Sequence, residues 1–297
     1  MQRGSDQGAT AVSEIIAKQE IAPRTFDIQV RAPEIAARRK AGQFVVLRVH
    51  EQGERFPLTI VSSDPEEGTI ELVFQAVGMS TLMLAEMKVG DDILDLVGPL
   101  GNPTQIERYG RCVVIGGGYG MAPVIPIAKA LRDAGNTLTG IIGARTRELV
   151  ILEDRFRELC ERLIVCTDDG SYGRKGFVTD ALAELVETGE QIDLVLAVGP
   201  TPMMRAVAEM TRELGIRTIV SLNPIMVDGT GMCGGCRVEV GGQTRFACID
   251  GPEFDGHLVD FEMLMKRQHM YDAIERDKRR GHACRLEEGS DRGQEAP

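Results

Sequence analysis

The stretch RCVVIGGGYGMAP, residues 111–123, passes from an apolar run through closely spaced glycines into a helical pattern. The same alternation of apolar strand and helical pattern continues to residue 223. Nearly all-apolar strands joined by crossovers of roughly 15–25 residues indicate a parallel sheet that is covered on both faces. The sequence therefore predicts a doubly wound α/β domain over residues 101–223. Its strands are expected at 111–117, 137–144, 162–167, 193–199 and 217–223, and its helices near 122–134, 148–161, 177–188 and 201–214.

The residues on either side of this domain have different patterns. Residues 12–100 consist of short β-branched or alternating runs separated by Pro, Gly or charged turns, which predicts a small antiparallel β-barrel. Residues 224–261 are rich in glycine and hold three cysteines. Residues 262–297 form a charged, helical tail that is expected to contact a partner or to be partly disordered. The predicted fold class is thus α/β with an added barrel.

The composition is that of a globular protein and excludes several classes of function. The 297 residues carry a net charge of −11, which argues against binding to nucleic acid or to an anionic membrane. No apolar run reaches the roughly 18 residues of a membrane span, and the first residues show no signal-peptide pattern, so a cytoplasmic protein is expected. The seven cysteines are an odd number, and thiols, metal ligands or redox groups are a better interpretation than disulfides.

The glycine turn after the first strand of the α/β domain predicts a nucleotide site. Its glycines let backbone N–H groups approach a pyrophosphate, and the following helix N-terminus adds a positive partial charge. Met121 replaces the last glycine of a complete G-x-G-x-x-G pattern, so a tight structural turn remains the alternative. Further strand ends at the same rim carry glycine or polar residues, where open α/β sheets bind ligands. The predicted set is Gly116, Gly117, Gly118, Gly120, Met121, Ala122, Arg145, Asp168, Gly199 and Pro200.

Two segments of the barrel region, RFPLTI at 55–60 and QAVGMST at 75–81, form a second candidate site. One interpretation is a plain strand and a glycine turn with a helix cap at Ser80. In the functional interpretation Arg55 neutralises a phosphate, Thr59 offers its hydroxyl to a flavin ring, and the second segment donates hydrogen bonds to a diphosphate. The predicted residues are Arg55, Pro57, Leu58, Thr59, Gln75, Gly78, Ser80 and Thr81, with Thr59 nearest to the chemistry.

The segment VDGTGMCGGCRVEVGGQTRFACIDG, residues 227–251, has the most specific pattern. Its candidate ligands are spaced Asp228-x4-Cys233-x2-Cys236-x11-Cys248, whereas plant-type 2Fe–2S ferredoxins use C-x4-C-x2-C and a distant fourth cysteine. Thiolates suit iron, and the intervening glycines let backbone N–H groups approach the sulfurs. A zinc site completed by His257 is the alternative. Three other cysteines are interpreted as packing residues: Cys112, Cys160 and Cys166.

Together these motifs resemble the iron–sulfur branch of the ferredoxin–NADP reductase superfamily. Within that branch the chain is similar to the family of small (alpha) subunits of NADH-dependent reduced ferredoxin:NADP oxidoreductase, and to the related small subunit of sulfide dehydrogenase. In these proteins one Asp and three Cys ligate the cluster. The electron-transfer subunit of dihydroorotate dehydrogenase B has a cysteine where Asp228 stands, and is the runner-up. The resemblance covers about residues 13–265, on the motifs RFPLTI, QAVGMST, GPLGN, GGGYGMAP, GARTRELVILEDRF, TDDGSYGRKGFVTD, AVGPTPMM and the cysteine segment.

The resemblance implies FAD at the barrel residues, NAD(H) at the glycine turn with NADP as the alternative, and a 2Fe–2S cluster on the one Asp and three Cys. It also implies a heterodimer with a larger subunit that carries a second FAD and 4Fe–4S clusters and bifurcates electrons between ferredoxin and NADP(H). The nucleotide preference is expected to depend on whether Arg145 and Arg147 face the ribose 2′ position. A redox-sensing subunit and a zinc-stabilised NAD-binding module are the other hypotheses.

Overall fold

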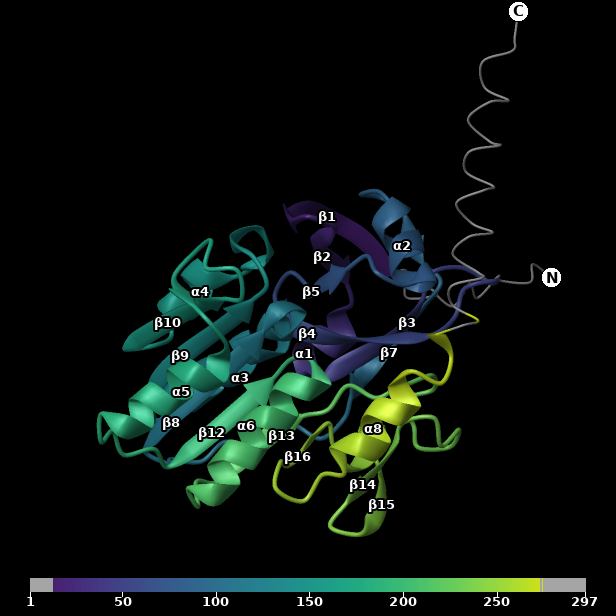
Figure 1. Cartoon of the computed structure of the whole chain (residues 1–297). Helices are drawn as coiled ribbons and strands as arrows, with labels where there is room; N and C mark the ends of the chain where they lie inside the picture. The colour runs from purple at the N-terminus through teal and green to yellow at the C-terminus, as the bar shows by residue number, and fades with distance from the viewer. Residues whose placement is uncertain (1–12, 273, 275–297) are drawn as a thin grey trace, which may run out of the picture.

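The computed structural model describes residues 13–272 and 274, which form a barrel, a parallel sheet and a small C-terminal region (Figure 1). Within these residues the barrel sheet has the order β6-β1-β2-β5-β4-β3-β7, with antiparallel neighbours throughout. Alternate residues of β2, such as Ile28 and Val30, are fully buried inside it, as the two-residue period of a strand requires. The elements are β1 (Ser13–Ala22), β2 (Thr25–Arg31), α1 (Pro33–Arg38), β3 (Phe44–Arg48), β4 (Phe56–Asp64), β5 (Thr69–Gln75), α2 (Met79–Glu86), β6 (Asp92–Ile93) and β7 (Asp95–Leu100).

The second sheet has the order β11-β10-β9-β8-β12-β13-β16, and only its β13–β16 pair is antiparallel among the residues described. Helices α3 and α4 contribute to the hydrophobic core on one face, and α5 and α6 to the core on the other. The elements are β8 (Arg111–Gly117), η1 (Gly118–Gly120), α3 (Met121–Asp133), β9 (Thr137–Ala144), η2 (Arg147–Leu149), α4 (Glu153–Arg157), β10 (Arg162–Thr167), β11 (Arg174–Lys175), α5 (Val178–Glu187), β12 (Leu194–Val198), α6 (Thr201–Glu213) and β13 (Thr218–Ser221).

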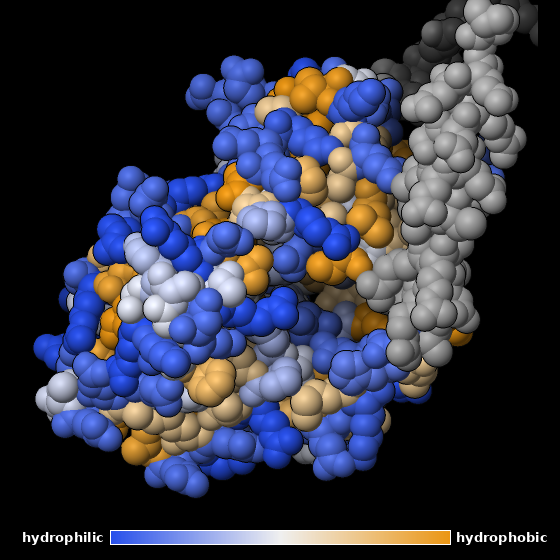
Figure 2. Space-filling view, turned by 45° about the horizontal axis from the view of Figure 1, so that its top comes forward, coloured by the Kyte–Doolittle hydropathy of each residue, from blue (hydrophilic) through white to orange (hydrophobic). Residues whose placement is uncertain are grey.

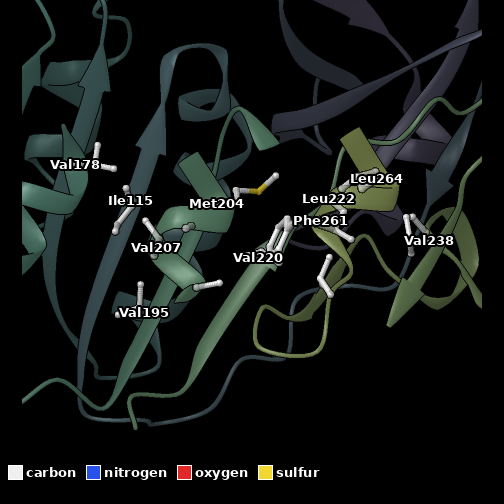
Figure 3. Close-up of a cluster of buried hydrophobic side chains, with 14 of the residues drawn as sticks. Ile115, Val178, Val195, Met204, Val207, Val220, Leu222, Val238, Phe261 and Leu264 are labelled. Carbon is white, nitrogen blue, oxygen red and sulfur yellow. The ribbon is translucent and has the colours of Figure 1, made fainter. Parts of the chain in front are cut away.

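The C-terminal region is attached to the parallel sheet by a strand and by a shared core. Strand β16 extends the sheet at its β13 edge. Val238, Phe261 and Leu264 of this region are buried in the same core as Met204 and Val207 of α6 (Figure 3). The region therefore has a fixed position relative to the parallel sheet. Its elements are β14 (Arg237–Val240), β15 (Gln243–Phe246), α7 (Ala247–Asp250), β16 (Glu253–Asp255) and α8 (Phe261–Gln268).

The predicted fold class is confirmed, and the local differences have physical causes. The helix expected near 148–161 is split into the short helices η2 and α4. The break falls at Leu152, whose φ of +56° is left-handed, a conformation that cannot continue a right-handed helix. Strand β16 was not predicted, because only three residues form it. In the predicted tail, α8 ends at Gln268, and residues 275–297 lie outside the described residues.

Most of the molecular surface in view is polar. Hydrophilic side chains predominate on the face in Figure 2, and apolar ones gather there in small patches. No helix in the described part of the chain is both long and apolar enough to cross a membrane.

The barrel and the parallel sheet are joined by an apolar contact and an ion pair. Val61 of β4 and Val73 of β5 are buried in the same core as helix α3. Arg155 of α4 reaches across to Glu71 of β5, with Nη2 3.0 Å from Oε2 and Nη1 on the other carboxylate oxygen. Such a two-point pair holds both partners in one geometry. Burial, and then the neighbouring Glu71 carboxylate, raise the pKa of Asp27 to about 6.

A half-buried carboxyl group links the C-terminal region to the barrel. The hydroxyl of Thr104 donates to Oε1 of Glu253 on β16. Gly42 closes this contact from the barrel side, since a Cβ there would lie 2.3 Å from the Thr104 hydroxyl and 2.9 Å from Glu253 Oε1. Burial raises the pKa of Glu253 to about 7. The side chain is therefore held in a site that favours its protonated form.

We expect Glu253→Gln to make the protein more stable than the wild type in alkaline solution. The folded-state pKa of Glu253, about 7, lies above its ordinary value of 4.5, so stability is lost as the pH rises through about 7. Glutamine keeps a hydrogen-bond acceptor for Thr104 and never ionises. Chemical denaturation measures the free energy of unfolding at pH 5 and pH 8.5. The amount by which the variant exceeds the wild type should grow by roughly 2 kcal/mol between these pH values, a figure already reduced for partial solvent access.

The control for this change is Glu187→Gln, at an exposed carboxylate on α5. The free energy of unfolding of this control should differ from that of the wild type by the same amount at both pH values. An equally constant difference for Glu253→Gln would contradict the buried-acid interpretation.

Candidate functional site

A cavity of about 850 Å³ lies between the barrel and the carboxyl ends of the parallel strands. Ten of the predicted residues line it, some from each half of the molecule. Because a single cavity contacts both predicted sites, ligands held by the barrel and by the glycine turn would lie side by side. The ten are Pro57, Thr59, Gln75, Gly117, Gly118, Gly120, Arg145, Asp168, Gly199 and Pro200.

The glycine turn is shaped by close backbone contacts. Strand β8 ends at Gly117, and η1 leads directly into α3. A Cβ on Gly120 would lie only 2.3 Å from the carbonyl oxygen of Val198, at the end of β12. Gly118 has a φ of +53°, which favours glycine. Met121 and Ala122 are fully buried in the core, so they can face a ligand only through their backbone N–H groups at the start of α3.

The barrel side presents Thr59 of β4 and Gln75 of β5 to the cavity. Leu58 lies in the barrel core, 5% exposed. Arg55 does not line the cavity, and its Nη2 is 3.4 Å from a carboxylate oxygen of Asp95. The hydrogen bond from Arg48, and to a smaller extent the one from Arg55, holds the pKa of Asp95 below its ordinary range. An anion bound by Arg55 would thus have to share it with Asp95.

The start of α2 is capped by its own side chains. The Thr81 hydroxyl oxygen accepts the N–H of Gly78 at 3.0 Å and that of Val77 at 3.1 Å, and donates to the Gly78 carbonyl. Gly78, Ser80 and Thr81 do not line the cavity. The helix cap is therefore made by Thr81 and not by Ser80, where it was predicted, because α2 already begins at Met79 and Thr81 is the residue that reaches back to Gly78. A role in diphosphate binding remains a prediction, which the backbone N–H groups at the helix start could serve.

Several cavity residues were missed in the sequence. Thr25 lies opposite Gln75 in the β2–β5 ladder, a pairing of strands that are not consecutive and that no local pattern reveals. Tyr119 lies inside the GGGYG motif but was not singled out. Phe177, at the start of α5, is a large apolar side chain that is 62% exposed, and the only available sequence signal was an aromatic residue directly after Gly176. Others that line the cavity are Phe44, Asn223 and Met226.

Only one of the two arginines considered for nucleotide preference faces the cavity. Arg145 lines it, close to Asp168. The guanidinium of Arg147 instead lies over the ring of Tyr172, 5.3 Å from the centroid. The side chain of Arg147 is thus occupied outside the predicted ribose pocket.

Two of the four predicted ligands meet through their sulfurs, and the other two meet through a carboxylate and a backbone N–H. The Sγ atoms of Cys236 and Cys248 are 3.1 Å apart and nearly inaccessible to solvent. Asp228 accepts the N–H groups of Thr230 at 2.9 Å and Cys233 at 2.8 Å, and the Thr230 bond is the main cause that holds its pKa below the ordinary range. Burial raises the pKa of the Cys248 thiol. An anionic carboxylate is thus already favoured at the position where an eighth cysteine would complete the ferredoxin pattern.

The three thiols and one carboxylate are a donor set whose chemistry fits a 2Fe–2S cluster. In the part of the chain that is described, no three His, Cys, Asp or Glu side chains converge as the ligands of one metal ion would. A 2Fe–2S cluster extends over two irons and takes four ligands. A loop that brings two cysteine sulfurs together and places the backbone N–H of Gly235 3.4 Å from the sulfur of a third cysteine, Cys233, suits such a cluster.

The zinc alternative fails at its fourth ligand. His257 Nε2 is 3.0 Å from the hydroxyl of Thr211 on α6, and the backbone N–H of His257 donates to Asp255. The imidazole is thus hydrogen-bonded on the parallel-sheet side. His257 does not complete a zinc site with the three cysteines.

Comparisons with known proteins agree with this division of the chain. The model "Oxidoreductase FAD-binding domain" matches residues 13–104, "Oxidoreductase NAD-binding domain" residues 114–209, and "Iron-sulfur cluster binding domain of dihydroorotate dehydrogenase B" residues 223–260. A Thermotoga maritima protein, described as a dihydroorotate dehydrogenase B (NAD(+)), electron transfer subunit homolog, is 52% identical over 264 residues, which are 89% of this chain and 93% of the relative. The chain belongs to this family of electron-transfer subunits and their homologues.

Solved structures extend the comparison. A chain from the structure of an NADH-dependent reduced ferredoxin-NADP oxidoreductase, described in work on flavin-based electron bifurcation, is 49% identical, with a TM-score of 0.85, and covers 92% of this chain and 99% of that one. A ferredoxin NADP+ reductase from Neisseria gonorrhoeae is 21% identical, with a TM-score of 0.58 over 69% of this chain and 91% of that one. This second likeness shows the shared fold alone.

Membership in the family establishes the cofactor classes and the type of enzyme. The chain has FAD-binding, NAD-binding and iron–sulfur-binding domains, and it is an oxidoreductase subunit. The predicted FAD, NAD(H) and iron–sulfur cofactors are therefore confirmed as classes. The individual binding residues remain predictions.

Proposed function

We propose that this chain is the NAD(H)-linked electron-transfer subunit of an NADH-dependent ferredoxin:NADP oxidoreductase that bifurcates electrons. The observation that carries the proposal is the single cavity lined by Thr59 and Gln75 of the barrel and by the glycine turn at 117–120. The likeness to the bifurcating oxidoreductase, at 49% identity, supports it. Asp228, at the position where the dihydroorotate-type subunits have a cysteine, favours it over a subunit of that enzyme.

The chain's own residues would bind, orient and insulate the reacting groups. A flavin accepts a hydride and releases electrons singly, which is chemistry that belongs to the cofactor. Thr59 and Gln75 present polar groups at the barrel wall, and the start of α3 presents backbone N–H groups to a pyrophosphate. The Arg155–Glu71 pair and the α3 contact hold the two walls together. No side chain is needed as a general acid or base.

The proposal includes a larger partner that carries a second FAD and 4Fe–4S clusters and exchanges electrons with ferredoxin and NADP(H). The relatives are named as electron-transfer subunits, which supports a heteromeric complex. A cytoplasmic location is also proposed, because none of the six cysteines in the described residues forms a disulfide, as a reducing compartment favours.

The test is anaerobic purification of the full chain followed by titration with NADH. The expected protein is yellow-brown, contains FAD and about two irons with acid-labile sulfide per chain, and is bleached by NADH. It should also pass electrons from NADH to ferricyanide or a viologen. A colourless, iron-free protein after cofactor reconstitution would overturn the proposal, and a loaded protein that NADH cannot reduce would favour a redox sensor.

The identity of the partner subunit distinguishes between the remaining candidate functions. Co-purification of the native complex should yield a second, larger flavin subunit that reduces ferredoxin. A dihydroorotate-oxidising partner would support the subunit of dihydroorotate dehydrogenase B instead, which the names of several relatives favour. A sulfide-oxidising partner would support sulfide dehydrogenase.

We expect Asp228→Cys to keep the cluster and to change its midpoint potential, since ligand identity is one of the levers on cluster potential. Cysteine restores the all-thiolate ferredoxin pattern. EPR-monitored redox titration measures the potential, and iron analysis shows that the cluster is retained. An unchanged spectrum and potential would mean that Asp228 is not a ligand. Asp272→Asn, at a half-buried aspartate outside the cluster loop, is the control.

A further inference from the structure

The guanidinium group of Arg267, on α8 of the charged tail, lies against the predicted cluster loop. Its Nη2 donates to the backbone carbonyl of Gly235 at 3.0 Å. Gly235 stands between the predicted ligands Cys233 and Cys236, and its own N–H is 3.4 Å from Cys233 Sγ. A single glycine residue thus connects the positive charge of Arg267 with a candidate ligand sulfur.

A second observation concerns the Nε of the same side chain. It is buried, and among the described residues it is the only such side-chain nitrogen or oxygen with no hydrogen-bond partner. Buried polar groups nearly always have a hydrogen-bond partner. A buried N–H beside this loop that has no partner in the polypeptide therefore indicates an acceptor on a bound group. The sulfurs of an iron–sulfur cluster accept such bonds, and these bonds are a recognised lever on cluster potential.

The position of Arg267 is fixed by the anchoring of α8 at both ends. At its start, the Asp260 carboxylate caps the helix by accepting the N–H of Met263 at 2.9 Å, and the Asp260 N–H donates to the carbonyl of Glu239 on β14 at 2.9 Å. At its end, Gln268 bonds to Asn223, 3.0 Å from the carbonyl oxygen, and to the Thr201 hydroxyl. The helix is therefore tied to the cluster hairpin and to the nucleotide cavity.

Partial burial distinguishes this charge from its neighbours, because Arg267 is half-buried and its Nε is inaccessible to solvent. Lys266, the preceding residue, has a side chain that is 74% exposed and pairs with Glu262. Water and salt screen an exposed charge, and its influence on the cluster is correspondingly small. Arg237 approaches the same loop, with a guanidinium nitrogen 3.9 Å from a Cβ built on Gly234, but it is exposed. Arg267 is thus the cation whose field reaches the loop with the least screening.

We propose that Arg267 is a positioning residue that raises the midpoint potential of the cluster. This rests on the proposed function, in which Asp228 and the three cysteines hold a 2Fe–2S centre. A cluster with four anionic ligands gains one further negative charge when it is reduced, and a nearby positive charge stabilises that state more than the oxidised one. An arginine keeps its charge at every accessible pH. Arg267 therefore makes the cluster a better acceptor of electrons from the flavin side.

The test compares Arg267→Met, Arg267→Gln and Arg267→Lys with Lys266→Met in the full, cluster-loaded chain. The readouts are iron and sulfide content and the midpoint potential from an EPR-monitored titration, with no need for turnover. We expect both neutral Arg267 variants to lower the ratio of reduced to oxidised cluster at a fixed potential about tenfold, or about 59 mV for one electron. The midpoint potential of Arg267→Lys should stay close to that of the wild type, and the midpoint potential of Lys266→Met should equal the wild-type value.

Each other outcome has a defined meaning. Neutral Arg267 variants with the same potential as Lys266→Met would overturn the proposal. Loss of iron from all three Arg267 variants would also overturn it, because Arg267 would then be a structural support of the loop. Loss of iron from the two neutral variants alone, with iron retained in Arg267→Lys, would support a requirement of the cluster for the positive charge. A wild-type chain without iron would instead refute the proposed function, so the two failures are distinguishable.

Discussion

Cys248→Ala should abolish the iron–sulfur centre while the flavin remains bound. Cys248 is 1% exposed, its sulfur lies 3.1 Å from that of Cys236, and alanine offers no ligand in its place. Because four ligands hold a 2Fe–2S cluster, we expect most of the iron and labile sulfide, about two of each per chain, to be lost. Metal analysis, EPR and the visible spectrum measure this directly. FAD content should stay near the wild-type value, since Cys248 does not line the cavity.

The matched control is Cys160→Ala. Burial also raises the pKa of the Cys160 thiol, but this residue lies beside β10, far from the glycine-rich loop in the sequence. The Cys160→Ala variant should keep its full iron content. Retention of the cluster in Cys248→Ala, or its loss in Cys160→Ala, would refute the assigned ligand set.

Gly120→Ala is expected to weaken NADH binding at least tenfold, which corresponds to about 1.4 kcal/mol. The added Cβ would lie 2.3 Å from the carbonyl oxygen of Val198 and 2.8 Å from the Cα of Gly199. Both of those atoms belong to the backbone, so no flexible side chain can move aside. The glycine turn and the β12 end must then separate, and both line the cavity. Titration of the FAD-loaded protein with NADH gives the affinity, and thermal unfolding gives the loss of stability.

Gly189→Ala separates a general loss of stability from an effect on the site. Gly189 has a φ of +78° and no atom within 4 Å of a built Cβ, so alanine there adds only backbone strain. Its NADH affinity should equal that of the wild type. Equal affinities for Gly120→Ala and the wild type would show that the nucleotide does not depend on this turn.

The local elements of this protein follow from its sequence, because each depends on a short-range pattern. Strand β8 and the start of α3 lie where the apolar run and the glycine turn at 111–123 predict them. The spacing of Asp228 and the three cysteines likewise predicted an iron–sulfur region, which the family model at 223–260 confirms. Leu152 shows the limit of such patterns, since its left-handed backbone interrupts a helix that periodicity extends.

The relations between those elements were decided only by the tertiary structure. The cavity exists because β2 pairs with β5 and α3 packs on the barrel, and periodicity reports which face of a strand is buried without naming its neighbour. His257 was a plausible zinc ligand by distance along the chain, but the fold places it on Thr211. Arg267 reaches Gly235 across 32 residues of sequence, a contact that only the packing of α8 on the cluster hairpin creates. The sequence thus determined which groups could do chemistry, and long-range packing determined which of them meet.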